Sequence, residues 1–231
     1  HFGIGNIFRI FIGGIADGLL EEGVLDRGIT CVETFDYDVV DKIYDPYDNL
    51  GLSVILHGDG TREYKVLGSL AEAVKAQSSD LAQWNRLKEI FTSKSLQMIS
   101  FTITEKGYSI YDGKGELLSV VESGFNDKPE NQQHLMGRVA ALCYRRFKTC
   151  KAPIALSSMD NCSHNGDKLK AGVMAFVDAW VKNGIVEKEF ADYMNDENQV
   201  SFPWSMIDKI TPRPDENVKK MLEKDGFEDT D

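Results

Sequence analysis

The sequence has no apolar run approaching the roughly 18 residues that a membrane-spanning helix needs, and it does not open with a signal-peptide pattern. Its four cysteines include no C-x-x-C pair, so neither a zinc site nor a disulfide framework is indicated. A basic excess is also missing, because 26 Lys and Arg stand against 37 Asp and Glu, a formal net charge of −11. These absences predict a cytoplasmic protein with no metal site and no nucleic-acid or membrane partner.

The chain itself alternates strand-like and helix-like segments. Strands are predicted at 28–34, 95–104 and 152–159, and a hairpin at 52–70 around a Gly-Asp-Gly turn. Helices are predicted at 7–22, 36–44, 69–77, 80–93, 131–148, 166–183 and 215–224, while 186–212 reads as mixed. This alternation predicts an α/β fold, a Rossmann-like doubly wound and mostly parallel sheet with a β-hairpin insertion.

The first residues contain a glycine pair of the kind that approaches a phosphate. Gly3 and Gly5 precede a predicted helix, whose N-terminus would supply N–H groups, and Arg9 lies one turn further on. The third glycine of the usual G-x-G-x-x-G pattern is replaced by Phe8. A simple tight turn between strand and helix is the alternative interpretation.

Polar clusters follow the predicted strands at Gly3–Arg9, 102–108 and 157–166. Ligands of parallel α/β sheets bind beyond the carboxyl ends of the strands, so these clusters predict one site. Glu33 ends the strand at 28–34, where an acid commonly binds the ribose hydroxyls and favours NAD over NADP. Asp36 and Asp38 are further candidates, but they can equally cap the next helix.

Four ordered motifs resemble the mannitol dehydrogenase family, the polyol-specific long-chain dehydrogenases that include mannitol 2-dehydrogenase and fructuronate (mannonate) reductase. The matches are G-x-G-N-x-x-R at Gly3, Gly5, Asn6 and Arg9, T-x-T-E-K-G-Y at 102–108, D-N-x-x-x-N-G at Asp160, Asn161, Asn165 and Gly166, and F-P-x-S-M-x-D-x-I-T-P at 202–212. Phe8 agrees with the family's own first motif. Trp204, Met159 and Cys162 depart from the family's usual residues, and they leave the exact substrate open.

The resemblance implies metal-independent hydride transfer between NAD and a polyol or sugar acid. It implies that Asn161 stabilises the developing alkoxide and that Asp208 serves a proton relay. Thr104, Glu105 and Lys106 would line the adenosine or nicotinamide ribose.

A purely structural role is the alternative for each of these residues. Asn161 could cap the helix that begins near Gly166, and Asp208 could form a buried salt bridge with Lys209 or Arg213. Lys106 could form a buried pair with a glutamate. Asn165 and Gly166 are expected to shape the helix start.

The resemblance also implies a missing part. Members of the family are considerably longer, and their mostly helical second domain carries a Lys-x4-Asn-x2-His motif whose lysine is the general base. Here Asn131 and His134 supply only half of that motif, in the wrong domain, and Asn126 stands at the lysine position. Residues 1–231 are therefore expected to be the nucleotide-binding domain alone, cut within its first strand and before the substrate domain, and to partner its own C-terminal domain.

The sequence also allows two other functional classes. An S-adenosylmethionine-dependent methyltransferase also uses a G-x-G turn and an acid after the second strand, but it leaves the T-x-T-E-K-G-Y run unexplained. A non-catalytic NADH-binding sensor is the second alternative, and it would require a chain that ends near Asp231.

Overall fold

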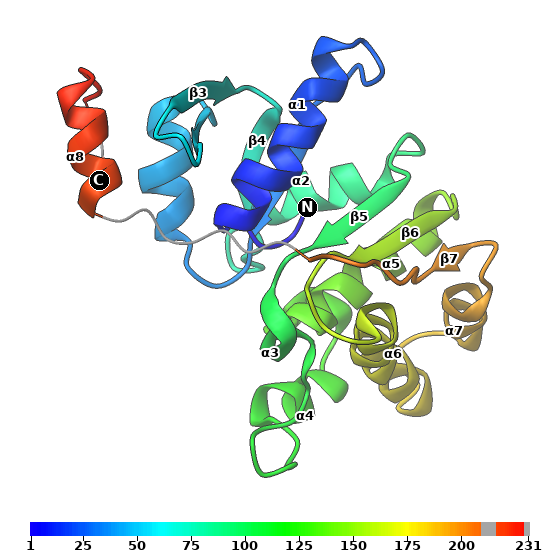
Figure 1. The fold of residues 1–231 in the computed structure, drawn as a ribbon. Coiled ribbons are helices and arrows are strands. Elements are labelled where there is room, and N and C mark those ends of the chain that lie inside the picture. Colours follow the sequence, from blue (N-terminus) through cyan, green and yellow to red (C-terminus); the bar gives the residue numbers. More distant parts are fainter. Residues whose placement is uncertain (209–215, 229–231) are drawn as a thin grey trace.

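The computed structural model describes residues 1–208 and 216–228. Its main sheet is built from short parallel strands (Figure 1). The strands are β1 (Ile29–Glu33), β4 (Leu70–Lys75), β5 (Met98–Phe101), β6 (Ile154–Ser158) and β7 (Val200–Ser201). Strand β1 pairs with β4 on one side of the sheet, and β6 lies between β5 and β7 on the other.

Residues 1–3 join the two halves of the sheet. Phe2 forms parallel bridges to both Val32 of β1 and Phe101 of β5. The N–H of Gly3 donates to the carbonyl of Val32 at 3.0 Å, and the N–H of Thr102 donates to the carbonyl of Phe2 at 2.9 Å. The spatial order is therefore β4, β1, residues 1–3, β5, β6, β7, which is the order of a Rossmann sheet. The strand order reverses between residues 1–3 and β5, and that is the point where such sheets bind ligands.

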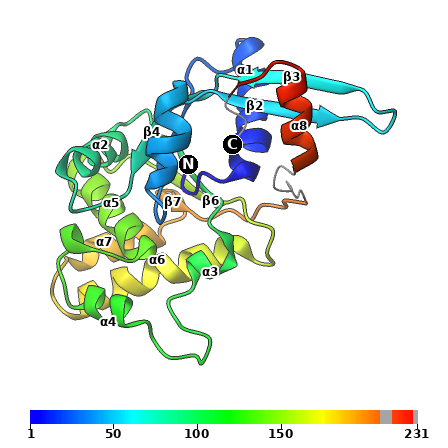
Figure 2. The same cartoon turned by 90° about the vertical axis from the view of Figure 1, so that its left-hand side faces the viewer.

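Helices cover the sheet, as Figures 1 and 2 show from two sides. The α-helices of the described residues are α1 (Gly13–Glu21), α2 (Leu81–Thr92), α3 (Thr104–Tyr108), α4 (Ser119–Phe125), α5 (Leu135–Thr149), α6 (Asn165–Lys182), α7 (Lys188–Asn195) and α8 (Glu216–Lys224). Helix α5 packs against both α2 and α6. Their apolar faces bury Phe101, Leu156 and Phe176 in the main core.

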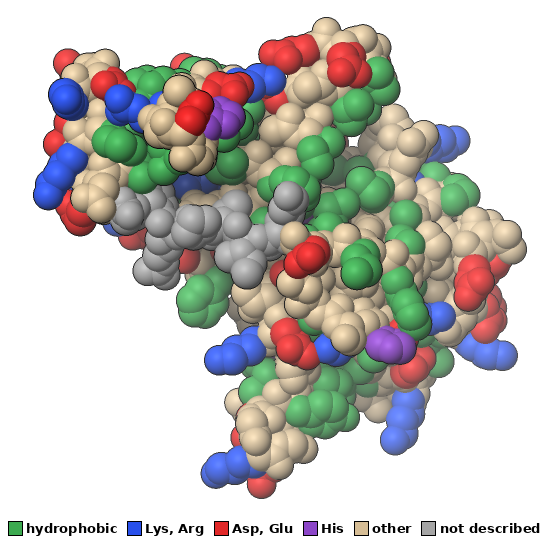
Figure 3. Space-filling model, viewed as in Figure 1, with side chains coloured by type: hydrophobic (Ala, Val, Ile, Leu, Met, Phe, Trp, Pro, Cys, Tyr) green, Lys and Arg blue, Asp and Glu red, His purple; other side chains and the backbone are tan. Residues whose placement is uncertain are grey.

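A β-hairpin and α8 form a separate edge of the molecule. Strands β2 (Gly51–Leu56) and β3 (Arg62–Leu67) pair antiparallel, which confirms the predicted hairpin. Helix α8 lies beside it in Figure 1, and Asp225, just beyond that helix, accepts a 2.8 Å bond from Arg62. Hydrophobic side chains gather around this hairpin at the upper left of Figure 3, where Ile55, Leu56 and Val66 are exposed.

Most predicted elements are confirmed, with shifted bounds. The predicted helix at 7–22 opens with a π-helical turn, Ile7–Ile12, before α1. The predicted helix at 36–44 contains a short π-helical turn, Val40–Tyr44. The predicted strand at 95–104 is β5 alone, and the T-E-K-G-Y residues form α3. Within residues 1–208 and 216–228, no helix is long and apolar enough to span a membrane.

One predicted element is wrong. The local pattern predicts a helix at 69–77, but Leu70–Lys75 forms strand β4, parallel to β1. Leu70 and Val74 are buried there. The helix-favouring Ala, Glu and Lys of this segment are overridden by pairing with a distant strand, which local propensity does not reveal.

Candidate functional site

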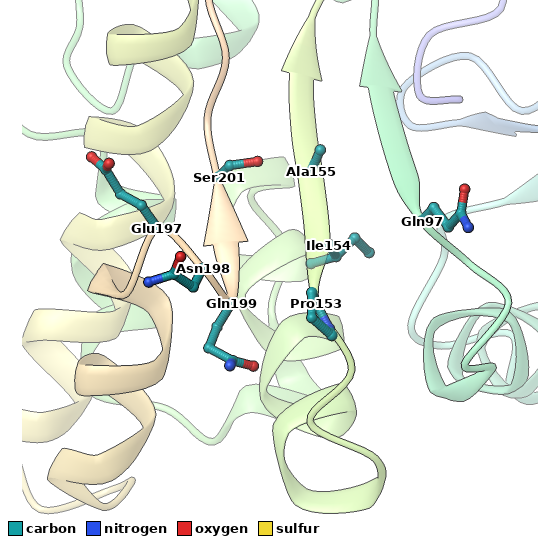
Figure 4. Close-up of a pocket in the computed structure, with 8 residues that line it drawn as sticks. All are labelled: Gln97, Pro153, Ile154, Ala155, Glu197, Asn198, Gln199 and Ser201. Carbon is teal, nitrogen blue, oxygen red and sulfur yellow. The ribbon is translucent and has the colours of Figure 1, made fainter.

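The carboxyl ends of the strands meet where residues 1–3 adjoin β5. A pocket of about 260 Å³ lies elsewhere, lined by Gln97, Pro153, Ile154, Ala155, Glu197, Asn198, Gln199 and Ser201 (Figure 4). Its lining includes the residues that begin β6 and precede β7, and therefore the amino ends of these strands. Because α/β sheets bind ligands at the opposite ends of their strands, we place the candidate site at the carboxyl edge.

The two glycines of the first turn have different structural roles. Gly3 has φ +88°, and a Cβ there would overlap the carbonyl of Thr102. Glycine at this position is therefore needed to join the turn to β5. Gly5 is exposed, and an added Cβ would meet nothing within 4 Å. The space beside Gly5 is open to a ligand.

Arg9 lies beside this open glycine with part of its hydrogen-bonding capacity unused. Its Nη2 donates to Asn6 Oδ1 at 2.7 Å, and its guanidinium lies 5.9 Å from the centre of the Tyr44 ring. Its Nε is buried and finds no acceptor among the described residues. A buried donor without a partner, next to the start of a helix, fits an anionic ligand such as a pyrophosphate.

Tyr44 holds the backbone of the Gly3–Gly5 turn by a hydrogen bond. Its hydroxyl donates to the carbonyl of Ile4 at 2.8 Å, and the side chain is 1 % exposed. Burial, its largest cause, raises the pKa of this phenol, so the hydroxyl stays protonated and remains a donor. No motif in the sequence points to Tyr44.

Glu33 ends β1, as predicted, and is buried. Its Oε1 accepts hydrogen bonds from the backbone N–H groups of Thr34 at 2.8 Å, Phe35 at 2.8 Å and Asp36 at 3.3 Å. One oxygen thus holds the following loop, and no protein donor to Oε2 is found in residues 1–208 and 216–228. Oε2 is the oxygen that could accept from ribose hydroxyls. Asp38, one of the two further acidic candidates, pairs with Lys42 at 2.7 Å instead.

Asp160 connects the end of β6 with the start of α3. Its carboxylate accepts from the N–H of Ile103 at 2.9 Å and of Thr104 at 3.0 Å, and from the Tyr108 hydroxyl at 2.5 Å. Thr104 has φ +64°, which is unfavourable for threonine. The two carboxylate bonds hold this strained backbone at the switch point of the sheet.

Asn165 and Gly166 shape the start of α6, as expected. The amide of Asn165 is buried and donates to the carbonyl of Ser205 at 3.0 Å and of Asp160 at 3.1 Å. A Cβ on Gly166 would lie 2.6 Å from the carbonyl of Phe202. Together they join α6 to the segment at 202–206.

Asn161 differs from its neighbours in this motif. Its side chain is exposed, and no hydrogen-bond partner for it is present in the described part of the chain. Capping of α6 was the alternative for this residue, but His164 holds the N-cap position and Asn165 makes the contacts there. Asn161 is left with a free amide at the carboxyl edge of the sheet.

The remaining predicted residues lie on the surface. Thr104, Glu105, Lys106 and Asp208 are all exposed. The buried Lys–Glu pair suggested for Lys106 is therefore wrong; Glu105 pairs instead with Lys168 on α6. The salt bridge suggested for Asp208 stays a prediction, because its suggested partners Lys209 and Arg213 lie outside the described residues. No group of three or more metal-ligating side chains is found in the part of the chain that the structure describes.

Trp204 and His164 make a further contact beside this motif. The indole Nε1 donates to Asp167 Oδ1 at 3.0 Å, and the ring lies edge-on to His164 with centroids 4.4 Å apart. Both side chains are exposed, yet each has a fixed partner. Trp204, which departs from the family's last motif, is thus hydrogen-bonded to the first turn of α6.

Comparison with known proteins decides the family. The model of the mannitol dehydrogenase Rossmann domain matches residues 1–228. The chain belongs to this family. A D-mannonate oxidoreductase of Thermotoga maritima is 51% identical over 228 residues, which cover 99% of this chain and 42% of the relative. A mannitol 2-dehydrogenase of Pyrenophora tritici-repentis is 29% identical, over 99% of this chain and 39% of its own length.

Solved structures agree with the family's fold. A Pseudomonas fluorescens mannitol 2-dehydrogenase, solved as a ternary complex with NAD and D-mannitol, is 26% identical with a TM-score of 0.79. That likeness covers 97% of this chain and 44% of the other. The chain thus has the Rossmann-like fold and spans less than half the length of these relatives.

Proposed function

We propose that this chain is the NAD-binding part of a dehydrogenase that interconverts a polyol or sugar acid and its keto form. One observation carries the proposal: the switch point of the sheet brings an open glycine, an arginine with a buried unpaired N–H, and the strand-end Glu33 to the same edge. Family membership supports it, and so does the related mannitol 2-dehydrogenase, whose structure was solved with NAD bound.

The cofactor, when bound, would accept or donate the hydride. Arg9 and the backbone beside Gly5 would bind its pyrophosphate, because both present unused donors or open space there. Glu33 Oε2 would accept from the ribose hydroxyls and would repel a 2′-phosphate, which favours NAD over NADP. Thr104, Glu105 and Lys106 would line the ribose from α3.

On the substrate side, we assign Asn161 the alkoxide-stabilising role. Its amide is free, while Asp160, Asn165 and Gly166 around it are engaged in structure. A positioned N–H donor lowers the energy of a developing oxyanion. Asp208 is exposed and available to a proton relay, although no partner in residues 1–208 and 216–228 supports that role.

We favour a sugar acid such as mannonate as the substrate, because the D-mannonate oxidoreductase is 51% identical and the mannitol 2-dehydrogenase 29%. We also propose that a second domain supplies the general base and completes the substrate site, since the chain covers 42% of the mannonate enzyme. A cytoplasmic location stays a prediction.

A fluorescence titration with NADH and NADPH tests the proposal. We expect saturable NADH binding, a weaker NADPH response, and no turnover by residues 1–231 alone. A protein that includes the second domain should then reduce fructuronate faster than fructose. Binding of S-adenosylmethionine in place of NADH would contradict the proposal and favour a methyltransferase, while NADH binding without turnover by the longer protein would favour a sensor.

A further inference from the structure

Arg138 is a buried cation close to the loop that follows β1. It lies in the first turn of α5 and is 7 % exposed. No carboxylate pairs with it in the described residues. An unpaired buried charge is unfavourable unless oxygen acceptors surround it, so its hydrogen bonds indicate why a charge is kept there.

Two of the hydrogen bonds of Arg138 connect it to residues that are distant in sequence. Arg138 Nε donates to the carbonyl of Gln132 at 3.2 Å, just before its own helix begins. Nη1 donates to the Tyr37 hydroxyl at 3.1 Å and more weakly, at 3.4 Å, to the carbonyl of Thr34. Both of these acceptors belong to the loop that Glu33 Oε1 holds from the strand end.

The contacts form a closed network around that loop. The Tyr37 hydroxyl donates its own proton to the carbonyl of Ala76 at 3.2 Å, just beyond β4. The N–H of Ala76 in turn donates to the backbone carbonyl of Glu33 at 2.7 Å. The loop is therefore fixed from two sides, by the Glu33 carboxylate and by Arg138.

We propose that Arg138 is a positioning residue for cofactor selection, which acts through Thr34 and Tyr37 to hold Glu33 in its ribose-binding position. The inference rests on the proposed function, because it assumes that Glu33 binds the ribose hydroxyls. It goes further by naming a second element, on a distant helix, that sets the preference for NADH over NADPH. With Glu33 at the ribose, the loop that Arg138 holds would face the adenosine end of the cofactor, so the phosphate turn should be unaffected.

The test compares NADH and NADPH affinities of variants of the 231-residue chain by fluorescence titration. Arg138→Met removes the charge at similar length. We expect its NADH dissociation constant to rise about tenfold, as for loss of one hydrogen bond from a charged donor. NADPH affinity should change less than about twofold, because Glu33 gives it no favourable contact. Arg138→Lys should restore part of the preference.

Tyr37→Phe and Arg146→Lys complete the design. Tyr37→Phe keeps the ring and the buried charge but removes the shared hydroxyl, and it should shift the NADH to NADPH ratio in the same direction by less. Arg146 is also buried and donates to carbonyls away from the β1 loop, among them those of Phe91 and Pro153. Its lysine variant should lower the melting temperature and leave the ratio unchanged.

The outcomes separate the two proposals. A wild-type chain that binds neither cofactor would overturn the proposed function and this inference with it. A wild-type preference for NADH that Arg138→Met and Tyr37→Phe leave intact would overturn only the inference. A selective loss of NADPH affinity in Arg138→Met would also overturn it, because Arg138 would then contact a 2′-phosphate directly.

Discussion

The carboxylate of Asp160 and the hydroxyl of Tyr108 lie 2.5 Å apart, across 52 residues of sequence. The same hydroxyl lies 2.7 Å from Ser158 Oγ, so the D-N-x-x-x-N-G motif and the T-E-K-G-Y motif are parts of one structure. Burial, then the bond to Asp160, raises the pKa of Tyr108, and the phenol remains a neutral donor. Asp160 thereby fixes the backbone beside Asn161 to the start of α3.

Asp160→Asn tests this connection. The amide keeps the shape but offers one acceptor oxygen where the carboxylate offers two, so a backbone N–H of Ile103 or Thr104 loses its partner. We expect the free energy of unfolding in urea to fall by about 2 kcal/mol. Tyr108→Phe, which leaves both backbone bonds in place, should have the smaller effect. An equal loss in the two variants would show that the Tyr108 hydroxyl, and not the two backbone bonds, carries the stabilisation.

Gly3→Ala and Gly5→Ala form a matched pair. At Gly3 an added methyl group overlaps Thr102, and the φ of +88° is itself unfavourable for alanine. This variant should lose about 3 kcal/mol of stability or more. At Gly5 the methyl group enters open space, so stability should change by less than about 0.5 kcal/mol.

For the affinity for NADH, in contrast to stability, we expect a clear effect of Gly5→Ala. The methyl group of Gly5→Ala occupies the space that a pyrophosphate needs, and we expect NADH affinity to fall about tenfold in a protein of normal melting temperature. Unchanged NADH affinity in Gly5→Ala would argue against a phosphate beside this turn.

Asn161→Ala and Asn165→Ala separate chemistry from folding within one motif. Asn161 has no partner in the described chain, so its alanine variant should keep its melting temperature. In a protein that includes the second domain, kcat should fall about 100-fold, the size of effect known for one oxyanion donor. Asn165→Ala should lose about 2 kcal/mol of stability, because its buried bonds to Ser205 and Gly166 disappear. A stability loss in Asn161→Ala with normal kcat would reverse the assignment.

The sequence predicts those parts of the fold and the site that depend on neighbouring residues or on a recognisable motif. Glu33 falls at a strand end because β-branched residues precede it, and the hairpin is evident because Gly58-Asp59-Gly60 interrupts an alternating pattern. Strand β4 is not predicted, because its conformation is set by pairing with β1, about 40 residues earlier in the chain. The contacts of Tyr44 and Arg138 are not predicted, for a similar reason. The carbonyls of Ile4 and Thr34, which accept from them, are distant in sequence, and neither residue type signals such a contact.

We expect His134 to make the stability of the fold sensitive to mildly acidic pH. Its Nδ1 accepts from the N–H of Met136 at 3.3 Å, and its ring stacks on Phe176 with centroids 5.8 Å apart. Burial, with a smaller effect of the Arg138 charge, lowers the pKa of His134 below its ordinary 6.5. The unfolded chain therefore takes up a proton at a higher pH than the folded chain.

Stability should consequently fall as the pH drops through about 6.5 toward the lower folded-state value, and it should be fully present above that range. His134→Asn keeps an acceptor at the N-cap position but cannot be protonated. We expect the variant's urea midpoint to vary less than the wild type's between about pH 7 and 5, where an unperturbed histidine titrates. Parallel midpoint curves for the two proteins would show that His134 protonates equally in both states, and the cause would then lie with the carboxylates.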